Sequence, residues 1–149
     1  MTGQEKIRFD LHFSSVFENT PPGAKILIDQ QEMFDGLLDN PVNKISFNCS
    51  LKFGIPHQLA IVRYNKPIDQ PAQSLIIDKI VIDGINIQNI IWANSYTEPE
   101  YPEPWASKQR AAGIELESQV LGETWLGHNS TWVLKFTSPF YQFVMNNLQ

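Results

Sequence analysis

Residues 75–87, LIIDKIVIDGINI, constrain the fold of this chain more than any other segment. Most of these residues are β-branched, and such side chains have restricted χ1 freedom and fit a pleated, packed surface better than a helix. Asp83-Gly84 interrupts the run where a tight turn would fall. The segment therefore predicts a buried central strand that turns sharply into a second strand, and the chain is expected to be a β-protein.

Period-two alternation of apolar and polar residues predicts further strands, each with one buried and one solvent-facing side. The alternation is clearest over residues 7–13 and 45–51, and shorter strands are predicted over residues 25–29 and 58–64. Gln30-Gln31 is expected to form the hairpin connection after the strand over 25–29. Proline and glycine cluster between these segments, as is typical of turns. Regularly spaced short strands predict an all-β fold, an antiparallel β-sandwich or jelly roll.

The composition of the chain changes at Tyr96. Residues 97–105, TEPEYPEPW, contain three prolines and three glutamates, so this segment is expected to be extended and to lie on the surface. Residues 105–112 are predicted to form one or two helical turns, which Gly113 ends in the left-handed conformation.

The remaining residues are expected to close the sandwich. Residues 115–121 and 131–136 predict a last pair of strands. Ser138-Pro139 fits the N-cap and first position of a helix over residues 139–148, whose apolar face should dock on the sheet. We therefore expect one domain over residues 1–149. Its parts are a sandwich core (6–95), a Pro-rich surface loop with a short helix (96–114), and closing strands with a C-terminal helix (115–149).

Charge and composition exclude several classes of partner. The 149 residues carry a net charge of −5, and no run of basic residues is present, so neither nucleic acid nor an anionic membrane is expected as a partner. No apolar run approaches the roughly 20 residues that span a bilayer. The N-terminus lacks the basic and apolar regions of a secretory signal, so we expect synthesis without a cleaved leader.

The first half of the chain carries a recognisable order of strands. After the strands over 25–30 and 44–51 come HQLAIVRYN, from His57 to Asn65, and LIIDKIVIDG, over 75–84. Over residues 6–87 this order resembles the β-sandwich carbohydrate-binding modules of the calcium-dependent xylan-binding type. The resemblance implies a β-sandwich that binds carbohydrate without catalysing a reaction. It also places the acidic calcium loop of that family at residues 69–74, DQPAQS, which contain one aspartate.

Calcium takes about 6–8 oxygen ligands, usually with several carboxylates. No metal or cofactor is therefore expected, with calcium as the open alternative.

A second resemblance concerns PEPW, at residues 102–105, and the closing W-x-L-x-F-x-x-PFY pattern from Trp132. These are similar to small proteins of tailed bacteriophages, which implies a structural or decoration protein of a virus particle.

Exposed aromatic and amide side chains in two loops are the candidate ligand site. Flat rings stack on the apolar faces of sugars, and neighbouring polar groups can bond the sugar hydroxyls. The loops over 65–73 and 96–105 are expected to form this site. Its candidate residues are Tyr64, Asn65, Asp69, Gln73, Tyr101 and Trp105. The alternative is that the same rings fasten the Pro-rich loop to the sandwich.

Catalytic and metal chemistry find little support in the sequence. His12, His57 and His128 lack the spacing of metal ligands, and His57 is expected to be structural. Cys49 alternates with apolar residues and should be an inert core residue. Neither a nucleophile elbow nor a phosphate-binding loop is present, and the protein is not expected to be an enzyme.

Carboxylates and tryptophans give the remaining expectations. Glu115 and Glu117 should share one strand face, which does not place two carboxyls across a cleft as glycoside hydrolysis requires. Three tryptophans sit in apolar strand context and are expected in the core. They are Trp92, Trp125 and Trp132.

Two functions follow from these features. The first is a non-catalytic module that binds carbohydrate, or a cell-surface glycan, through loop aromatics. The second is an oligomeric structural protein of a tailed bacteriophage, in which the same aromatics contact another copy or other virion proteins. The expected location is accordingly the virion or the cytoplasm.

Overall fold

The predicted central hairpin is present in the computed structural model, which describes residues 3–147. Strand β6 (Ser74–Ile82) turns into the short strand β7 (Ile85–Asn86), and the two strands are paired. Asp83 and Gly84 have φ angles of 48° and 79°. Two consecutive left-handed residues are what a type I′ hairpin turn requires, and Asp-Gly adopts them at low cost.

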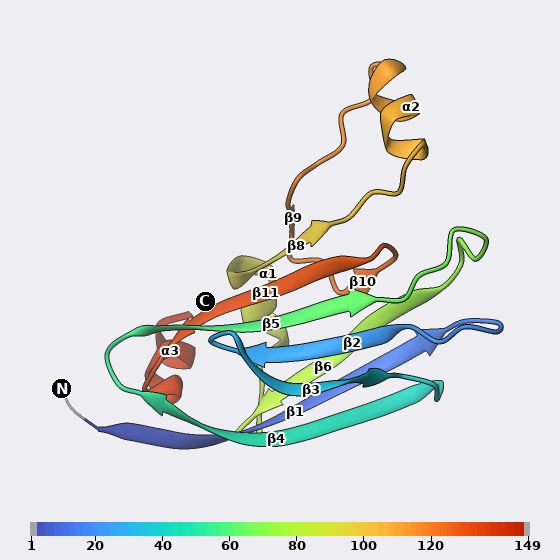
Figure 1. Cartoon of the computed structure of the whole chain (residues 1–149). Coiled ribbons are helices and arrows are strands. Elements are labelled where there is room, and N and C mark those ends of the chain that lie inside the picture. Colours follow the sequence, from blue (N-terminus) through green and yellow to red (C-terminus); the bar gives the residue numbers. More distant parts are fainter. Residues whose placement is uncertain (1–2, 148–149) are drawn as a thin grey trace.

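Two antiparallel sheets face each other (Figure 1). The first contains, in spatial order, β10 (Trp125–Leu126), β6, β1 (Gln4–Val16) and β4 (Val42–Lys52), with β7 beside β6. The second contains β3 (Gln31–Leu37), β2 (Gly23–Ile28), β5 (Pro56–Tyr64), β11 (Ser130–Thr137), β8 (Ser95–Pro99) and β9 (Val120–Leu121). The predicted antiparallel β-sandwich is thus confirmed.

The core lies between the sheets and follows the alternation seen in the sequence. Four alternate residues of β1 are fully buried, and they face the inward side chains of β5 and β11. Phe9 and Phe136 link the two layers, with ring centroids 6.2 Å apart. The buried β1 residues are Ile7, Phe9, Leu11 and Phe13. Burial of this apolar surface is the main force that holds the layers together.

The hairpin after β2 differs by one residue from the prediction. Its turn is at Asp29 and Gln30, with φ angles of 49° and 68°, and Gln31 already belongs to β3. Asp29 takes the first turn position because its carboxylate accepts hydrogen bonds from the Gln58 backbone and from His57. His57 is buried, and its other ring nitrogen contacts the carbonyl oxygen of Lys52 at 2.8 Å, so its expected structural role is confirmed.

A helix that the sequence reading missed follows β7. Helix α1 (Gln88–Asn94) buries Ile90 and Ile91 against the core. Trp92, expected in a strand, lies in this helix, and its side chain is outside the described part of the structure. The predicted short helix does form, as α2 (Trp105–Ala111), and Gly113 beyond it has the expected positive φ of 82°.

The predicted strand over residues 131–136 is present as β11, but its predicted pairing with residues 115–121 is wrong. β11 lies between β5 and β8 and pairs with both, so neither of its edges is free for residues 115–121. Only β9 in that segment is a strand, and it pairs with β8. Glu115 and Glu117 therefore lie in a loop and share no strand face.

The C-terminal helix is α3 (Phe140–Asn147), and the predicted position 148 lies outside the described residues. Its apolar residues Phe140 and Phe143 pack on Phe136 of the sheet, as expected. The predicted N-cap at Ser138 is wrong. Instead, the Glu5 carboxylate accepts hydrogen bonds from the Ser138 hydroxyl and, at 2.6 Å, from the backbone N–H of Phe140.

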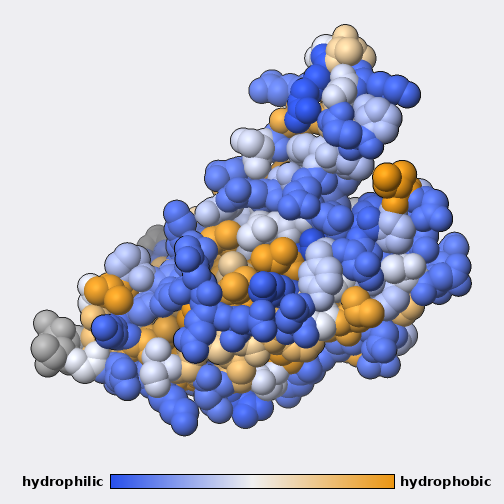
Figure 2. Space-filling view, in the orientation of Figure 1, coloured by the Kyte–Doolittle hydropathy of each residue, from blue (hydrophilic) through white to orange (hydrophobic). Residues whose placement is uncertain are grey.

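Residues 100–119, which we call the arm, leave the sandwich between β8 and β9 and carry α2 at their tip (Figure 1). In the space-filling view the arm stands away from the body of the molecule, and its surface is mainly hydrophilic (Figure 2). Ala106 is its one buried residue. No helix within the described residues is long and apolar enough to cross a membrane.

Candidate functional site

The two loops predicted to form the site lie on either side of one groove. The groove has a volume of about 390 Å³ and lies between the β5–β6 loop and the base of the arm. Ile68, at its rim, is 84% exposed, which is unusual for an isoleucine. Its principal lining residues are Lys66, Ile68, Pro71, Pro102, Trp105 and His128. The groove is therefore a mainly apolar hollow with a few polar groups, as small-molecule sites usually are.

An aromatic cluster forms the wall of the groove on the side of the arm. The ring of Tyr101 lies 6.1 Å from that of Trp105 and meets His128 edge-on at 5.4 Å. Trp105 also lies 6.1 Å from His128 and remains 42% exposed. The Tyr101 hydroxyl donates to the carbonyl oxygen of Glu117 at 2.7 Å, which joins the two ends of the arm. These contacts position Trp105 with part of its indole ring free for a ligand.

A buried arginine supports the loops that form the groove. Arg63 is 1% exposed and donates to the carbonyl oxygen of Gln73 at 2.7 Å, to Asn129 Oδ1 at 3.1 Å and to the carbonyl oxygen of Leu126 at 3.3 Å. Burial lowers the pKa of Arg63 to about 10. Asn129 Oδ1 also accepts the backbone N–H of Lys66. Arg63 thus links β5 to the end of the β5–β6 loop and to the β10–β11 connection, and it does not itself line the groove.

Five of the six candidate residues do not line the groove. Gln73 is buried, and its amide nitrogen donates to the carbonyl oxygens of Thr20 and Asn65. Tyr64 donates its hydroxyl to Asp35 at 2.5 Å, and its ring covers a glycine of β2. Asn65 has a φ of 72°, and its side-chain amide donates a hydrogen bond to the carbonyl oxygen of Pro21. These three side chains connect parts of the protein to one another.

The other three candidates are differently placed. Asp69 is exposed and borders a separate hollow on the β5–β6 loop. Trp105 lines the groove, and Tyr101 supports it. Lys66 and the pair His128-Asn129 also line it but were not identified from the sequence, because the pair lies far along the chain from the loop that contains Lys66. Only the His-Asn pair directly before β11 offers a weak signal, since polar residues at strand ends often line sites.

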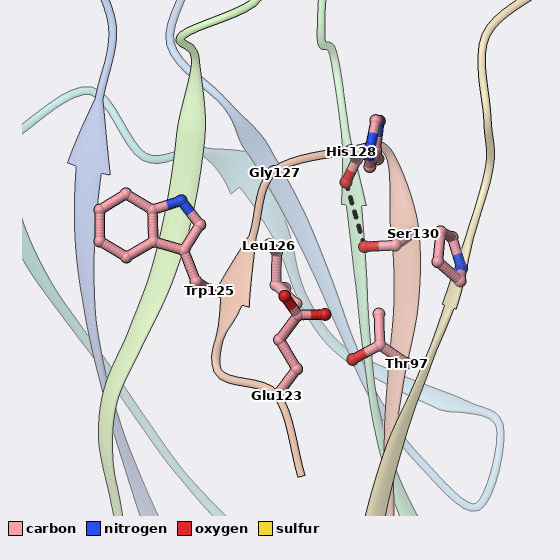
Figure 3. A pocket seen from close by; sticks show the side chains of 8 residues that line it. Thr97, Glu123, Trp125, Leu126, Gly127, His128 and Ser130 are labelled. Carbon is pink, nitrogen blue, oxygen red and sulfur yellow. Dashed lines mark hydrogen bonds between the residues drawn. The ribbon is translucent and has the colours of Figure 1, made fainter. Parts of the chain in front are cut away.

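A second hollow, which we call the notch, lies next to the groove. It has a volume of about 190 Å³ and opens where β10 of one sheet separates from β8 and β11 of the other (Figure 3). Its lining residues include Thr97, Glu123, Trp125, Leu126, His128 and Ser130. His128 lines both hollows, so the notch and the groove are neighbours.

Burial and nearby charges shift the pKa of two notch residues. Burial, reinforced by Glu117, raises the pKa of the Glu123 carboxyl. Burial, with Lys66 and Arg63 nearby, lowers the pKa of His128 below 6.5. Near neutral pH the notch therefore contains a neutral imidazole and a partly desolvated carboxyl group.

Two of the three tryptophan expectations can be checked. Trp132 is fully buried, as expected, and its indole N–H donates to the carbonyl oxygen of Glu123 at 3.1 Å. The expectation that Trp125 lies in the core is wrong, because it is 54% exposed. β10 has two residues at a sheet edge, and Leu126 takes the inward position. Alternation along the strand then turns Trp125 outward.

The β5–β6 loop does not fit calcium. It offers one carboxylate, the exposed Asp69, and two buried amide oxygens without a hydrogen-bond partner, Gln70 Oε1 and Gln73 Oε1. Across residues 3–147, no three His, Cys, Asp or Glu side chains cluster closely enough to hold a metal ion. Calcium prefers about 6–8 oxygens with several carboxylates, which this loop does not supply.

The fold is an antiparallel β-sandwich similar to those of solved carbohydrate-binding modules. One similar structure is vCBM60 in complex with galactobiose, which matches 87% of this chain and 97% of its own, with a TM-score of 0.54 and 11% identity. Another is a selenomethionine form of vCBM60, from work linking two families of calcium-dependent carbohydrate-binding modules by circular permutation. It matches 86% of this chain and 89% of its own, with a TM-score of 0.58 and 12% identity. The likeness confirms the expected fold.

Sequence comparisons add little. No family model matches the chain. A stretch of 49 residues, 33% of the chain, is 41% identical to Copper-transporting ATPase 2 from Homo sapiens, and it spans 3% of that protein. Neither these matches nor the solved structures support the similarity to tailed-bacteriophage proteins.

Proposed function

We propose that this protein is a non-catalytic module that binds carbohydrate in the groove. The observation that carries the proposal is the half-exposed indole ring of Trp105, held in place by Tyr101 and His128 at the edge of a mainly apolar hollow. An aromatic face of this kind stacks on the apolar face of a sugar. Lys66 and Asn129 line the groove and can hydrogen-bond sugar hydroxyls. The galactobiose complex of vCBM60 supports the same class of ligand.

Replacement of Trp105 tests this proposal. Trp105→Ala removes the stacking surface and should raise the Kd for a bound glycan at least about tenfold, roughly 1.4 kcal/mol. Binding is measured on a glycan array and then by calorimetry with galactobiose and xylobiose. The matched control is Tyr141→Ala, which removes another exposed aromatic, on α3 and away from the groove, and should leave the Kd unchanged. A Trp105→Ala variant that is folded and binds like the wild type would refute the site.

We expect carbohydrate binding to be independent of calcium, because the β5–β6 loop lacks the carboxylates that the ion prefers. A ligand that binds only the folded state must raise the melting temperature. Thermal unfolding with excess calcium and with EDTA should therefore give the same Tm, and the Kd for galactobiose should also be the same. A higher Tm and tighter binding with calcium would reverse this expectation.

The virion alternative rests on the sequence resemblance alone. It predicts a stable oligomer in which the arm contacts a neighbouring copy. Analytical ultracentrifugation distinguishes the two functions: a monomer that binds glycan agrees with the module, whereas a ring or trimer without glycan binding at millimolar concentrations agrees with the structural protein.

A further inference from the structure

The notch contains a buried hydroxyl that has no partner within the chain. Thr97, in β8, lies opposite Trp132 in the sheet and is 2% exposed. Its Oγ1 has no hydrogen-bond partner among the described residues. A buried hydroxyl without a partner destabilises the folded state, whereas a valine of the same shape would not. The fold alone therefore gives no reason for a hydroxyl at this position.

A carboxylate faces the same space. Figure 3 shows Thr97 on β8 and Glu123, just before β10, on opposite sides of the notch, with the Thr97 oxygen directed toward the Glu123 side. The backbone of Glu123 is fixed because its carbonyl oxygen accepts the indole N–H of Trp132. No basic side chain among the described residues pairs with the Glu123 carboxylate. A carboxylate and a hydroxyl that share one small hollow suit a ligand with several hydroxyl groups.

The charges around the notch select against an anionic ligand. Glu123 lines it, and Glu117 lies close enough to raise the pKa of the Glu123 carboxyl further. His128 is the one basic side chain in the lining, and its lowered pKa keeps it neutral near pH 7. A neutral sugar fits these groups, because its hydroxyls can donate to Glu123 and accept from Thr97 or His128.

The size and position of the notch set the length of the ligand. Its volume of about 190 Å³ corresponds to roughly six water molecules at ~30 Å³ each, which is room for one small ring. The groove has about twice that volume, and His128 lines both hollows. We infer that the notch is a second subsite for one neutral sugar ring, so that the protein recognises a chain of about three sugars rather than a single sugar or a disaccharide. This inference rests on the proposed function of the groove.

The experiment compares ligands of increasing length with variants at Thr97. Calorimetry with galacto- and xylo-oligosaccharides of one to four units is carried out on the wild type, Thr97→Val and Thr97→Ser. For the wild type, affinity should rise from the disaccharide to the trisaccharide and then level off. Thr97→Val should bind the trisaccharide about tenfold more weakly, as expected for the loss of one well-placed hydrogen bond, and bind the disaccharide as the wild type does. Thr97→Ser keeps the hydroxyl and should keep the preference for the trisaccharide.

Stability gives a second readout that does not depend on the ligand. Unliganded Thr97→Val should melt about 2–4 °C higher than the wild type, because the buried hydroxyl without a partner is gone. Equal affinity of the wild type for two and three sugars, or equal trisaccharide affinity of Thr97→Val and the wild type, would overturn the second subsite while leaving the groove intact. Weakening by Thr97→Ser as large as that by Thr97→Val would also overturn it. If the wild type binds none of these sugars, the proposed function itself fails.

Discussion

Replacing the buried Arg63 with methionine should destabilise the protein strongly, because its guanidinium group holds the end of the β5–β6 loop and the β10–β11 connection together. The bonds to Gln73, Asn129 and Leu126 measure 2.7, 3.1 and 3.3 Å. A hydrogen bond from a charged donor contributes about 1.5–3 kcal/mol, and less at the longest distance, so the three together contribute roughly 5 kcal/mol. Burial of a charge without a counter-ion costs a few kcal/mol, which offsets part of this. The expected net loss in unfolding free energy is about 2–3 kcal/mol.

Thermal unfolding followed by circular dichroism measures this loss. For a chain of about 150 residues, 1 kcal/mol corresponds to roughly 2–4 °C in Tm, so Arg63→Met should melt about 5–10 °C below the wild type. The matched control is Arg8→Met. Arg8 is exposed and pairs with Asp10 at the surface, and such pairs contribute about 0–1 kcal/mol. Its Tm should therefore change little.

Arg63→Lys separates the charge from the geometry. Lysine keeps the buried charge, but its single nitrogen cannot reach all three acceptor oxygens. We expect it to destabilise the protein about as much as methionine does. An Arg63→Met variant that melts at or above the wild-type temperature would refute the reasoning, because the cost of burying the charge would then exceed the value of the hydrogen bonds.

Three further predictions follow from buried or paired groups. Burial raises the pKa of the Cys49 thiol to about 11, so the native protein should not react with a thiol reagent at pH 8, and rapid labelling without denaturant would contradict this. The pKa of His128 is lowered below 6.5, so just below that pH the unfolded state binds more protons than the folded state. The free energy of unfolding measured in urea should therefore fall as the pH drops from 7 through 6.5. His128→Gln should reduce the slope of unfolding free energy against pH. An unchanged slope would mean that other groups dominate. Glu5→Gln weakens the cap on Phe140 and should cost about 1 kcal/mol in urea unfolding, whereas an unchanged midpoint would show that the cap contributes nothing.

The sandwich could be predicted because apolar and polar residues alternate along its strands with a period of two. The inward residues of β1 and the Asp-Gly turn after β6 leave few other folds open. Helix α1 was missed because its isoleucines favour a strand by propensity. The sequence nevertheless contains a helical signal, since Ile87, Ile90 and Ile91 recur at the i, i+3 and i+4 spacing and all three are buried. The pairing of β11 was missed because register between distant segments is decided by packing across the whole sheet.

The two loops around the groove could be predicted, but most of the residues that line it could not. Gln73, Tyr64 and Asn65 have the composition of a sugar-binding site, yet their hydrogen bonds go to other parts of the protein. Sequence alone does not distinguish a polar side chain that braces a loop from one that faces a ligand, because both kinds occur in polar loops next to strands. His128 was missed for the opposite reason: it lies far along the chain and reaches the groove only when β11 pairs with β5.

The two walls of the groove are attached to the sandwich in different ways, and this difference separates bracing residues from binding residues. The β5–β6 wall is fixed by Arg63 and Gln73, whose side chains donate hydrogen bonds to backbone carbonyl oxygens. The arm is attached through the hydrogen bond from the backbone N–H of Glu100 to the carbonyl oxygen of Asn129 and through the edge-on contact of Tyr101 with His128, and it buries only one residue. Substitutions at Gln73 should therefore lower stability with little effect on ligand preference. Substitutions at His128, which lines both hollows and supports the arm, should weaken binding even under conditions where the fold is intact.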